Sequence, residues 1–497
     1  MIKIILLLSL FVRFYNLDYP LSYIFAWGDG TRDYFIANHI VKFGEIPHLG
    51  PYNLLYEIGI YNTPVYFYLL SLFLLIYNNV LTLAAINILI QIFGIFLIYL
   101  IAKKLFDEKA AILSILIFSF NPEILAQSDY IWQPHISTPL AYLALLFLIY
   151  FYFNRSYKYI LVSAMSLAFS FSMHYSSVPW VPLFFLVWLF LLKKKLFFYV
   201  GLLICFFTFL IILHIPVGMF LTQSSLSPSP THSLAILNIG QYLSNFQTNF
   251  QGILKAFNIN SLWLGLAAVF GLFYFFKSKD RKETKMFVFM LIILMLTPIL
   301  FASFFNKFRL HYLSLSLGVF AIFLGKIFTC LLASRRSGPA GRPLPKFLGL
   351  VIIFLLIKTL TFDFKFLNFE KKPLENQKFV YDISSAIINE VNGPNSFQIK
   401  SYAMDEKIFE YPTLDTVFLI PLEEKLNKKL AVLDDNSPFN HHQIGGKEYF
   451  IVACHDFHMQ ERWDECLNTF TDKYPSYAIL KNLHTGSRVS IYVTKHE

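Results

Sequence analysis

Long apolar runs separated by short polar connections make up most of the chain, as far as Thr361. Each run is roughly 20 residues long, which is the length that an α-helix needs to cross the hydrocarbon core of a bilayer. The pattern predicts a polytopic α-helical membrane protein with about eleven transmembrane helices and additional juxtamembrane helices. We expect this transmembrane module to occupy residues 1–361.

The pattern changes after Thr361, where charged residues become frequent and no spanning run remains. Helical periodicity predicts a helix over Tyr381–Val391, and the sequence predicts strands at Glu448–Cys454 and Val489–Thr494. Residues 362–497 are therefore expected to form a small soluble α/β domain.

Lys and Arg residues are concentrated in some connections and scarce in others, which predicts the orientation of the chain in the membrane. By the positive-inside rule the basic connections should be cytoplasmic. The N-terminus, with Lys3 before the first apolar run, is expected to be cytoplasmic and to remain as a first span. The C-terminal domain is then extracytoplasmic, at the outer face of the cell membrane. The basic connections are Lys103 to Lys109, Arg155 to Lys158, Lys193 to Lys195, Lys277 to Lys285 and Arg335 to Lys346.

The apolar run from Pro64 to Tyr77 needs a separate interpretation. If it crossed the membrane, Lys103 and every later basic connection would lie on the opposite side. The run is also short, and Asn62 and Asn78 flank it. We therefore predict an interfacial or re-entrant juxtamembrane helix here, with the second span at Val80–Ile101.

Composition supports the membrane assignment and excludes other classes. Hydrophobic residues make up 56% of the chain and charged residues 14%, whereas soluble proteins carry about 25% charged residues. The formal charge of +10 lies in the short tracts between apolar runs, so it does not indicate nucleic-acid binding. Cys454 and Cys466 both lie in the predicted external domain, where they are either a disulfide or two thiols.

A short polar segment after the first apolar run carries the candidate chemistry. A helix that begins near Asp29 would place Asp29, Arg32 and Asp33 on one surface, because their spacing is i, i+3 and i+4. That helix should continue as an amphipathic stripe lying on the membrane and end at Gly44. Charged groups at a membrane are costly and indicate a functional site. The alternative is that Asp29 is simply the N-cap of an interfacial helix.

Two further polar groups fall on connections expected to lie outside. One lies between Asn121 and His135, and the other comprises Lys307, Arg309, His311 and Tyr312. Arg309 belongs to a basic group on the side where the positive-inside rule disfavours it, and phosphate binding would explain its presence. The predicted substrate-binding residues are Arg32, Asp129, Gln133, His135, Arg309, His311 and Tyr312.

These residue types suit glycosyl transfer from a lipid phosphate. An Asp can act as general base toward an acceptor hydroxyl, so Asp29 and Asp33 are the predicted catalytic residues. Arg can stabilise the departing phosphate electrostatically. We expect no cofactor and no metal, although Asp29 with Asp33 or Asp129 has the chemistry to hold a divalent ion.

The segment Gly28–Asp33 resembles the motif of membrane glycosyltransferases that use polyprenyl-phosphate sugars, the C superfamily. The protein O-mannosyltransferases and the lipid A aminoarabinose transferases are the most similar groups. Asp29 matches the catalytic Asp of that superfamily and Arg32 matches its Arg. The Pro64 helix resembles its juxtamembrane helix, Trp132-Gln133-Pro134 resembles a motif on an outer loop, and Arg309–Tyr312 is similar to a late R-x-x-Y segment.

The resemblance implies a hexosyl- or pentosyltransferase that moves a monosaccharide from a polyprenyl-phosphate donor to a hydroxyl of a lipid, protein or glycan. Inversion of the anomeric centre is also expected. Two positions differ from the superfamily: Gly30 replaces an acidic residue, and Thr63 replaces a Lys of some lipid A transferases. Two other functions fit the same topology, a polysaccharide polymerase or ligase and a transporter of lipid-linked glycans. Transporters typically carry internal repeats and broken helices, and the sequence has neither.

Overall fold

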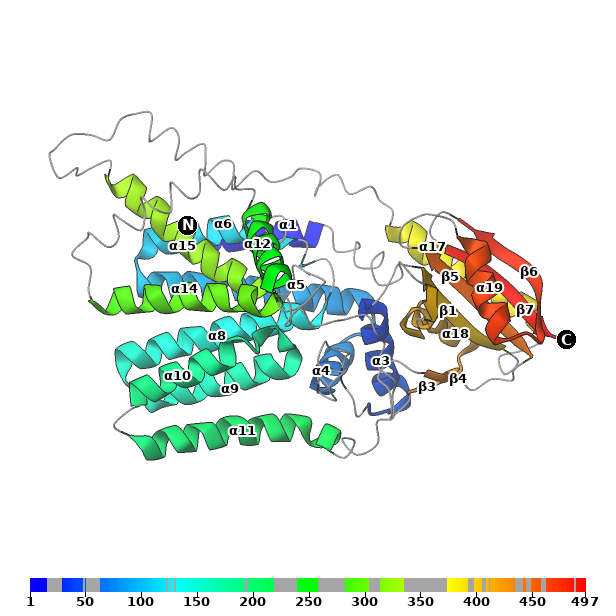
Figure 1. Ribbon diagram of the computed structural model, residues 1–497, viewed down its shortest axis with the longest axis horizontal. Helices are drawn as coiled ribbons and strands as arrows, with labels where there is room; N and C mark the ends of the chain where they lie inside the picture. Colours follow the sequence, from blue (N-terminus) through cyan, green and yellow to red (C-terminus); the bar gives the residue numbers. More distant parts are fainter. Residues whose placement is uncertain are drawn as a thin grey trace.

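The structure, a computed structural model, places a block of long helices beside a smaller α/β unit, with two short helices between them (Figure 1). The residues that it describes are 1–15, 29–47, 50, 63–121, 124–125, 127–128, 131–192, 195–218, 239–257, 282–303, 313–334, 373–391, 397–404, 408–410, 412–433, 441–443, 448–456, 462–486 and 489–497.

The block of helices packs around one apolar core. The closest neighbours in it are α8 with α9, α6 with α15, and α5 with both α6 and α8. Its described helices are α1 (Ile2–Tyr15), α5 (Val80–Leu105), α6 (Glu108–Ser119), α8 (Gln133–Asn154), α9 (Tyr157–Met173), α10 (Trp180–Leu192), α11 (Leu196–Gly218), α12 (Ile239–Ala256), α14 (Lys282–Ala302) and α15 (Ser314–Ser334).

Within the described part of the chain, α5 and α8 are long and apolar enough to cross a membrane. The α5 helix begins at Val80, where the second span was predicted. Shorter apolar segments recur in five places, so the helical architecture agrees with the prediction but the number of about eleven spans is not confirmed. The shorter segments are Val65–Leu74, Trp180–Leu192, Phe197–Leu210, Leu291–Ala302 and Ser314–Cys330.

Basic residues gather at one end of the block. Lys104 Nζ lies 4.9 Å from the ring centre of Phe153, at the end of α8. Lys195 Nζ lies 4.9 Å from the ring centre of Tyr157, at the start of α9. Lys104 at the end of α5, the connection between α8 and α9, and Lys195 before α11 therefore lie at the same end of the block.

The other end of the block meets α3 (Asp29–Phe43) and α4 (Val65–Leu74). The α3 helix ends before Gly44, whose φ of +68° is a conformation that glycine adopts without strain. Both bounds of this helix were predicted. The α4 helix has 10 residues, about 15 Å of helix, which is too short to span a core of about 30 Å.

The environment of α3 corrects one expectation. The helix was expected to lie on the membrane as an amphipathic stripe, but every residue from Gly30 to His39 is buried. Protein covers it because α4 packs on it from the membrane block and α18 (Thr416–Leu426) from the C-terminal unit. Phe35 and Phe67 share one apolar cluster with Phe418 of α18. The charged side chains of Arg32 and Asp33 are therefore enclosed by protein rather than solvated.

The C-terminal unit is a five-stranded sheet in the order β2-β1-β5-β7-β6, with β1 parallel to β5 and the other neighbours antiparallel. A separate two-stranded sheet pairs β3 with β4. The elements are α17 (Pro373–Glu390), β1 (Phe397–Met404), β2 (Ile408–Glu410), η6 (Pro412–Asp415), α18, β3 (Ala431–Leu433), β4 (His441–Gln443), β5 (Tyr449–Asp456), α19 (Trp463–Lys473), β6 (Tyr477–Thr485) and β7 (Val489–His496).

The two faces of this sheet carry different cores because side chains alternate along β5. Ile451 and Ala453 join the cluster that contains α3, α4 and α18, whereas Phe450 and Val452 join the cluster formed with α19. The predicted helix and both predicted strands are present as α17, β5 and β7. Cys454 and Cys466 form a disulfide between β5 and α19, which decides between the two states left open above.

Candidate functional site

Arg32 lies at the centre of a group of charges in the first turns of α3. Its Nη1 donates to Asp29 Oδ1 at 2.8 Å, while Nε and Nη2 donate to Asp33 Oδ1 at 2.8 and 2.5 Å. The side chains of Arg32 and Asp33 are buried, but that of Asp29 is 38% exposed. One guanidinium therefore holds two carboxylates, and the carboxylate of Asp29 is the one that faces outward.

Asp33 receives a further donor from the helical block. Gln133 Nε2, at the first residue of α8, donates to Asp33 Oδ2 at 3.1 Å. Burial raises the pKa of Asp33 to about 7, although Arg32 lowers it. Tyr66 of α4 is fully buried near Asp33. Burial, and after it the charge of Asp33, raise the pKa of the Tyr66 hydroxyl well above its ordinary value. A carboxyl that titrates near neutral pH is typical of functional sites.

The segment that delivers Gln133 is held in place by polar side chains of α5. Asn87 Nδ2 donates to the carbonyl of Gln127 at 3.0 Å, and Gln91 Nε2 donates to the carbonyl of His135 at 2.9 Å. Asn87 is fully buried in an otherwise apolar helix. These two amides explain why polar residues persist inside α5, since they position the start of α8 against α3.

The structure brings together four of the predicted site residues, Asp29, Arg32, Asp33 and Gln133. The ring of His135, also predicted, packs edge to face against Trp132, with ring centres 5.7 Å apart. The other predicted residues, Asp129, Arg309, His311 and Tyr312, lie outside the described residues.

Asn121, and Thr63 at the position where some lipid A transferases carry a Lys, have clear structural contacts. Asn121 is fully buried, donates to the carbonyl of Ala256 at 2.5 Å, and accepts from the backbone N–H of Ile124 at 3.2 Å. Thr63 is also fully buried and donates to the carbonyl of Ser172 at 3.3 Å. Both side chains therefore tie connections to neighbouring elements.

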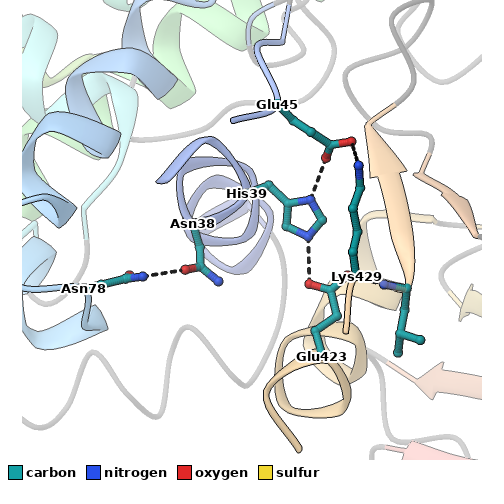
Figure 2. A network of polar contacts seen from close by, with 7 residues as sticks. Asn38, His39, Glu45, Asn78, Glu423 and Lys429 are labelled. Atoms are coloured by element: carbon teal, nitrogen blue, oxygen red, sulfur yellow. Dashed lines mark hydrogen bonds and ion pairs between the residues drawn. The ribbon is translucent and has the colours of Figure 1, made fainter. Parts of the chain in front are cut away.

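A second polar network on α3 was not predicted. His39 contacts Glu45 and Glu423, and Lys429 contacts Glu45 (Figure 2). Tyr66, beside Asp33, was also missed. The sequence offers one signal for His39, an ionisable residue within an apolar stretch, but none that connects it to Glu423, which is 384 residues away.

The arrangement at Arg32 bears on metal binding. The guanidinium takes the position between Asp29 and Asp33 that a bridging divalent ion would need. Among the described residues, no group of three or more His, Cys, Asp or Glu side chains has the arrangement of a metal site. The expectation of a reaction without metal remains a prediction.

Comparison with known proteins relates this site to a family. Residues 61–214 match the family model described as dolichyl-phosphate-mannose-protein mannosyltransferase. The chain resembles the crystal structures of ArnT from Cupriavidus metallidurans bound to undecaprenyl phosphate and in the apo state. Both have a TM-score of 0.61, with 10% and 11% identity, over 99% of this chain and 97% of ArnT. No curated protein matches the chain by sequence.

A third structure, the oligosaccharyltransferase of Archaeoglobus fulgidus in the apo form, has a TM-score of 0.49 and 15% identity, over 78% of this chain and 58% of that one. The similarity to ArnT over nearly the whole length of both chains shows that this chain has an ArnT-like fold. Together with the family match it confirms the resemblance that the sequence motifs indicated.

Proposed function

We propose that this chain is a membrane glycosyltransferase of the C superfamily. It transfers a monosaccharide from a polyprenyl-phosphate donor to an acceptor hydroxyl at the outer face of the cell membrane. The observation that carries the proposal is the partly exposed carboxylate of Asp29. It pairs with the buried guanidinium of Arg32, which also pairs with Asp33. A base must be oriented and accessible, and Asp29 meets both conditions.

The reaction follows from these positions. Asp29 accepts the proton of the acceptor hydroxyl as its oxygen attacks the anomeric carbon. The bond from that carbon to the phosphate oxygen breaks, and the polyprenyl phosphate leaves with the electron pair. Attack opposite to the leaving group inverts the anomeric centre. Asp33 and Gln133 contribute by holding Arg32 and, through it, the orientation of Asp29.

The leaving phosphate requires positive charge rather than a proton, because a phosphate ester anion is already a good leaving group. Arg32 is one cation of the site, and Arg309 and His311 are proposed as further phosphate-binding groups from their place in the sequence. The ArnT structure bound to undecaprenyl phosphate, the product that such a reaction releases, supports a donor whose sugar is linked to a lipid phosphate. The acceptor class is a lipid, protein or glycan hydroxyl.

The test is an Asp29→Asn variant assayed with radiolabelled sugars on polyprenyl phosphate, in purified protein. We expect transfer to fall by at least about 100-fold, the usual contribution of a general base. Asp472→Asn, the same change at an exposed position of α19, is the matched control and should retain activity. Full activity of Asp29→Asn would exclude Asp29 as the base, and no consumption of any donor by the native protein would reject the proposed function.

A further inference from the structure

His39 lies between two carboxylates that come from different parts of the chain (Figure 2). Its Nδ1 is 2.7 Å from Glu45 Oε2, on the segment that follows α3, and its Nε2 is 2.7 Å from Glu423 Oε2, on α18. The imidazole is fully buried and the Glu423 side chain is 5% exposed. Lys429, which follows α18, forms an ion pair with Glu45.

The geometry defines how many protons this network holds. Both ring nitrogens are at hydrogen-bond distance from carboxylate oxygens, and carboxylates are acceptors. A neutral imidazole has one N–H, so two hydrogen bonds to two carboxylates require the imidazolium. With His39 charged, two cations face two anions and the network is neutral. Loss of that proton would remove one of these two hydrogen bonds and leave a carboxylate oxygen facing the lone pair of a ring nitrogen, which is unfavourable.

The surroundings of His39 favour the charged form. Its ring lies between Phe35 and Phe43, with ring centres 4.1 and 4.9 Å away. Burial by itself would lower the pKa of His39, but hydrogen bonds and charges from Glu423 and Glu45 together raise it. Glu423 also accepts the backbone N–H of Leu430 at 2.9 Å, which orients its carboxylate.

The other elements packed on α3 carry few titratable groups. In α4, Tyr66 lies beside Asp33, and Tyr68 donates its hydroxyl proton to the carbonyl of Pro47 at 2.6 Å. In η6, Asp415 is buried. On α18, Glu424 lies beyond Glu423 and contacts Tyr381 of α17. The charges that face His39 directly are thus those of Glu45 and Glu423.

This network connects the C-terminal unit to the helix that carries the candidate site. His39 follows Asp29 by ten residues on α3, which corresponds to about 15 Å along a helix. Apolar packing against α18 attracts α3 but is not directional. Two charge-assisted hydrogen bonds at one buried imidazole do have direction, so they fix both the rotation of α3 and its position along its axis.

We propose that His39 is a positioning residue for sugar transfer. Held by Glu423 of the C-terminal unit and by Glu45, it keeps α3 in the register in which Asp33 meets Gln133 and Arg32 presents Asp29. The C-terminal unit is accordingly part of the active enzyme, because α3 adopts its working position when α18 is docked. This inference rests on the proposed function for its catalytic consequence, while its structural part stands independently.

The pH dependence has a definite sign. Because the pKa of His39 is raised in the folded protein, its contribution is fully present below the ordinary value of 6.5 and disappears as pH rises through the raised value. His39→Gln should lack this contribution at every pH. His39→Lys restores a cation with several N–H donors, and it should extend the contribution to higher pH because the ordinary pKa of Lys is about 10.4.

Hydrogen exchange of the full-length protein measures the positioning without any substrate. We expect the protection factors of α3 amides, corrected for intrinsic exchange, to be at least tenfold lower in His39→Gln than in the native protein at pH 6. The native values should decline at alkaline pH, and those of His39→Lys should not. Glu390→Gln, which breaks a partly exposed ion pair with Lys481 inside the C-terminal unit, is the matched control and should change neither value.

Transfer assays then test the catalytic part. His39→Gln should lower kcat at least tenfold, with a smaller change in the donor KM, and His39→Lys should recover much of that loss. Native protection of α3 in His39→Gln would overturn the inference, whatever the enzyme transfers. A loosened α3 with an unchanged kcat would also overturn it, because His39 would then be structural alone. Failure to find any donor would leave the exchange result intact and would count against the proposed function instead.

Discussion

The two ends of α3 carry two ion-pair networks that are built in opposite ways. At the N-terminal end, Arg32 pairs with two carboxylates within four residues of each other, and one of them is 38% exposed. At the C-terminal end, His39 joins carboxylates 6 and 384 residues away, and its side chain is fully buried. The first network has one cation for two anions, whereas the second has two cations for two anions.

This difference in charge balance indicates what each network can do. A neutral, closed network has no remaining charge to offer a substrate, so its contribution is to fix geometry. A network with an excess carboxylate at its exposed edge can accept a proton or meet a cationic group. Asp29 occupies that edge. The network at Arg32 is therefore suited to catalysis, and the network at His39 is suited to positioning α3.

The largest effect should follow from removing the cation of the first network. Arg32→Ala leaves Asp33 buried without its partner, which costs about 3–5 kcal/mol if the carboxylate stays ionised. The carboxyl will instead remain protonated to higher pH, and Asp29 loses its anchor. We expect transfer to fall by at least about 1000-fold, comparable to the loss of an electrostatic group at a reaction centre.

The measurement for Arg32→Ala is donor consumption, with a thermal unfolding curve for the same preparation. Arg32→Lys refines it, because an ammonium cannot reproduce the forked contacts to both carboxylates. If Arg32→Lys were as active as the native protein, a point charge would be sufficient and the fork would have no role.

A pH shift should follow from changing the neighbour of Asp33. The pKa of Asp33 is already raised to about 7, so this carboxyl is protonated on the acid side of neutrality and then releases Arg32. Activity should therefore fall as pH drops through about 7. Gln133→Glu places a like charge beside Asp33 and should move this acid limb to higher pH.

The control for this shift is Gln133→Ala, which removes the hydrogen bond without adding charge and should move the limb less. The measurement is kcat/KM as a function of pH. An acid limb in the same place for both variants and the native enzyme would show that Asp33 does not govern the profile.

The contrast between the networks also explains which features could be predicted from the sequence. The bounds of α3 and the grouping of Asp29, Arg32 and Asp33 follow from local spacing and from Gly44, so they could be predicted. The approach of Gln133 to Asp33 depends on tertiary contacts, yet both residues were selected because each lies in a polar segment between apolar runs. Spacing did not predict that they would touch.

The remaining errors have physical causes of the same kind. The burial of α3 could not be inferred, because its covering helix, α18, lies about 380 residues further along the chain. The network at His39 was missed for the same reason. The number of spans stays a prediction, because hydropathy alone does not distinguish a 12-residue helix such as α6 from a full crossing.

The smallest expected effect comes from a neutral contact on the same helix. Asn38 is next to His39 but points the other way, where its Oδ1 accepts from Asn78 Nδ2 at 2.9 Å (Figure 2). Asn38→Ala removes one uncharged hydrogen bond, worth about 1 kcal/mol, and leaves the charges of both networks unchanged. We expect a loss of transfer of less than about threefold with the same pH profile as the native enzyme, since the altered contact is not titratable. If Asn38→Ala reduced transfer as strongly as His39→Gln, any loosening of α3 would suffice, and the charge at His39 would have no special part in positioning the helix.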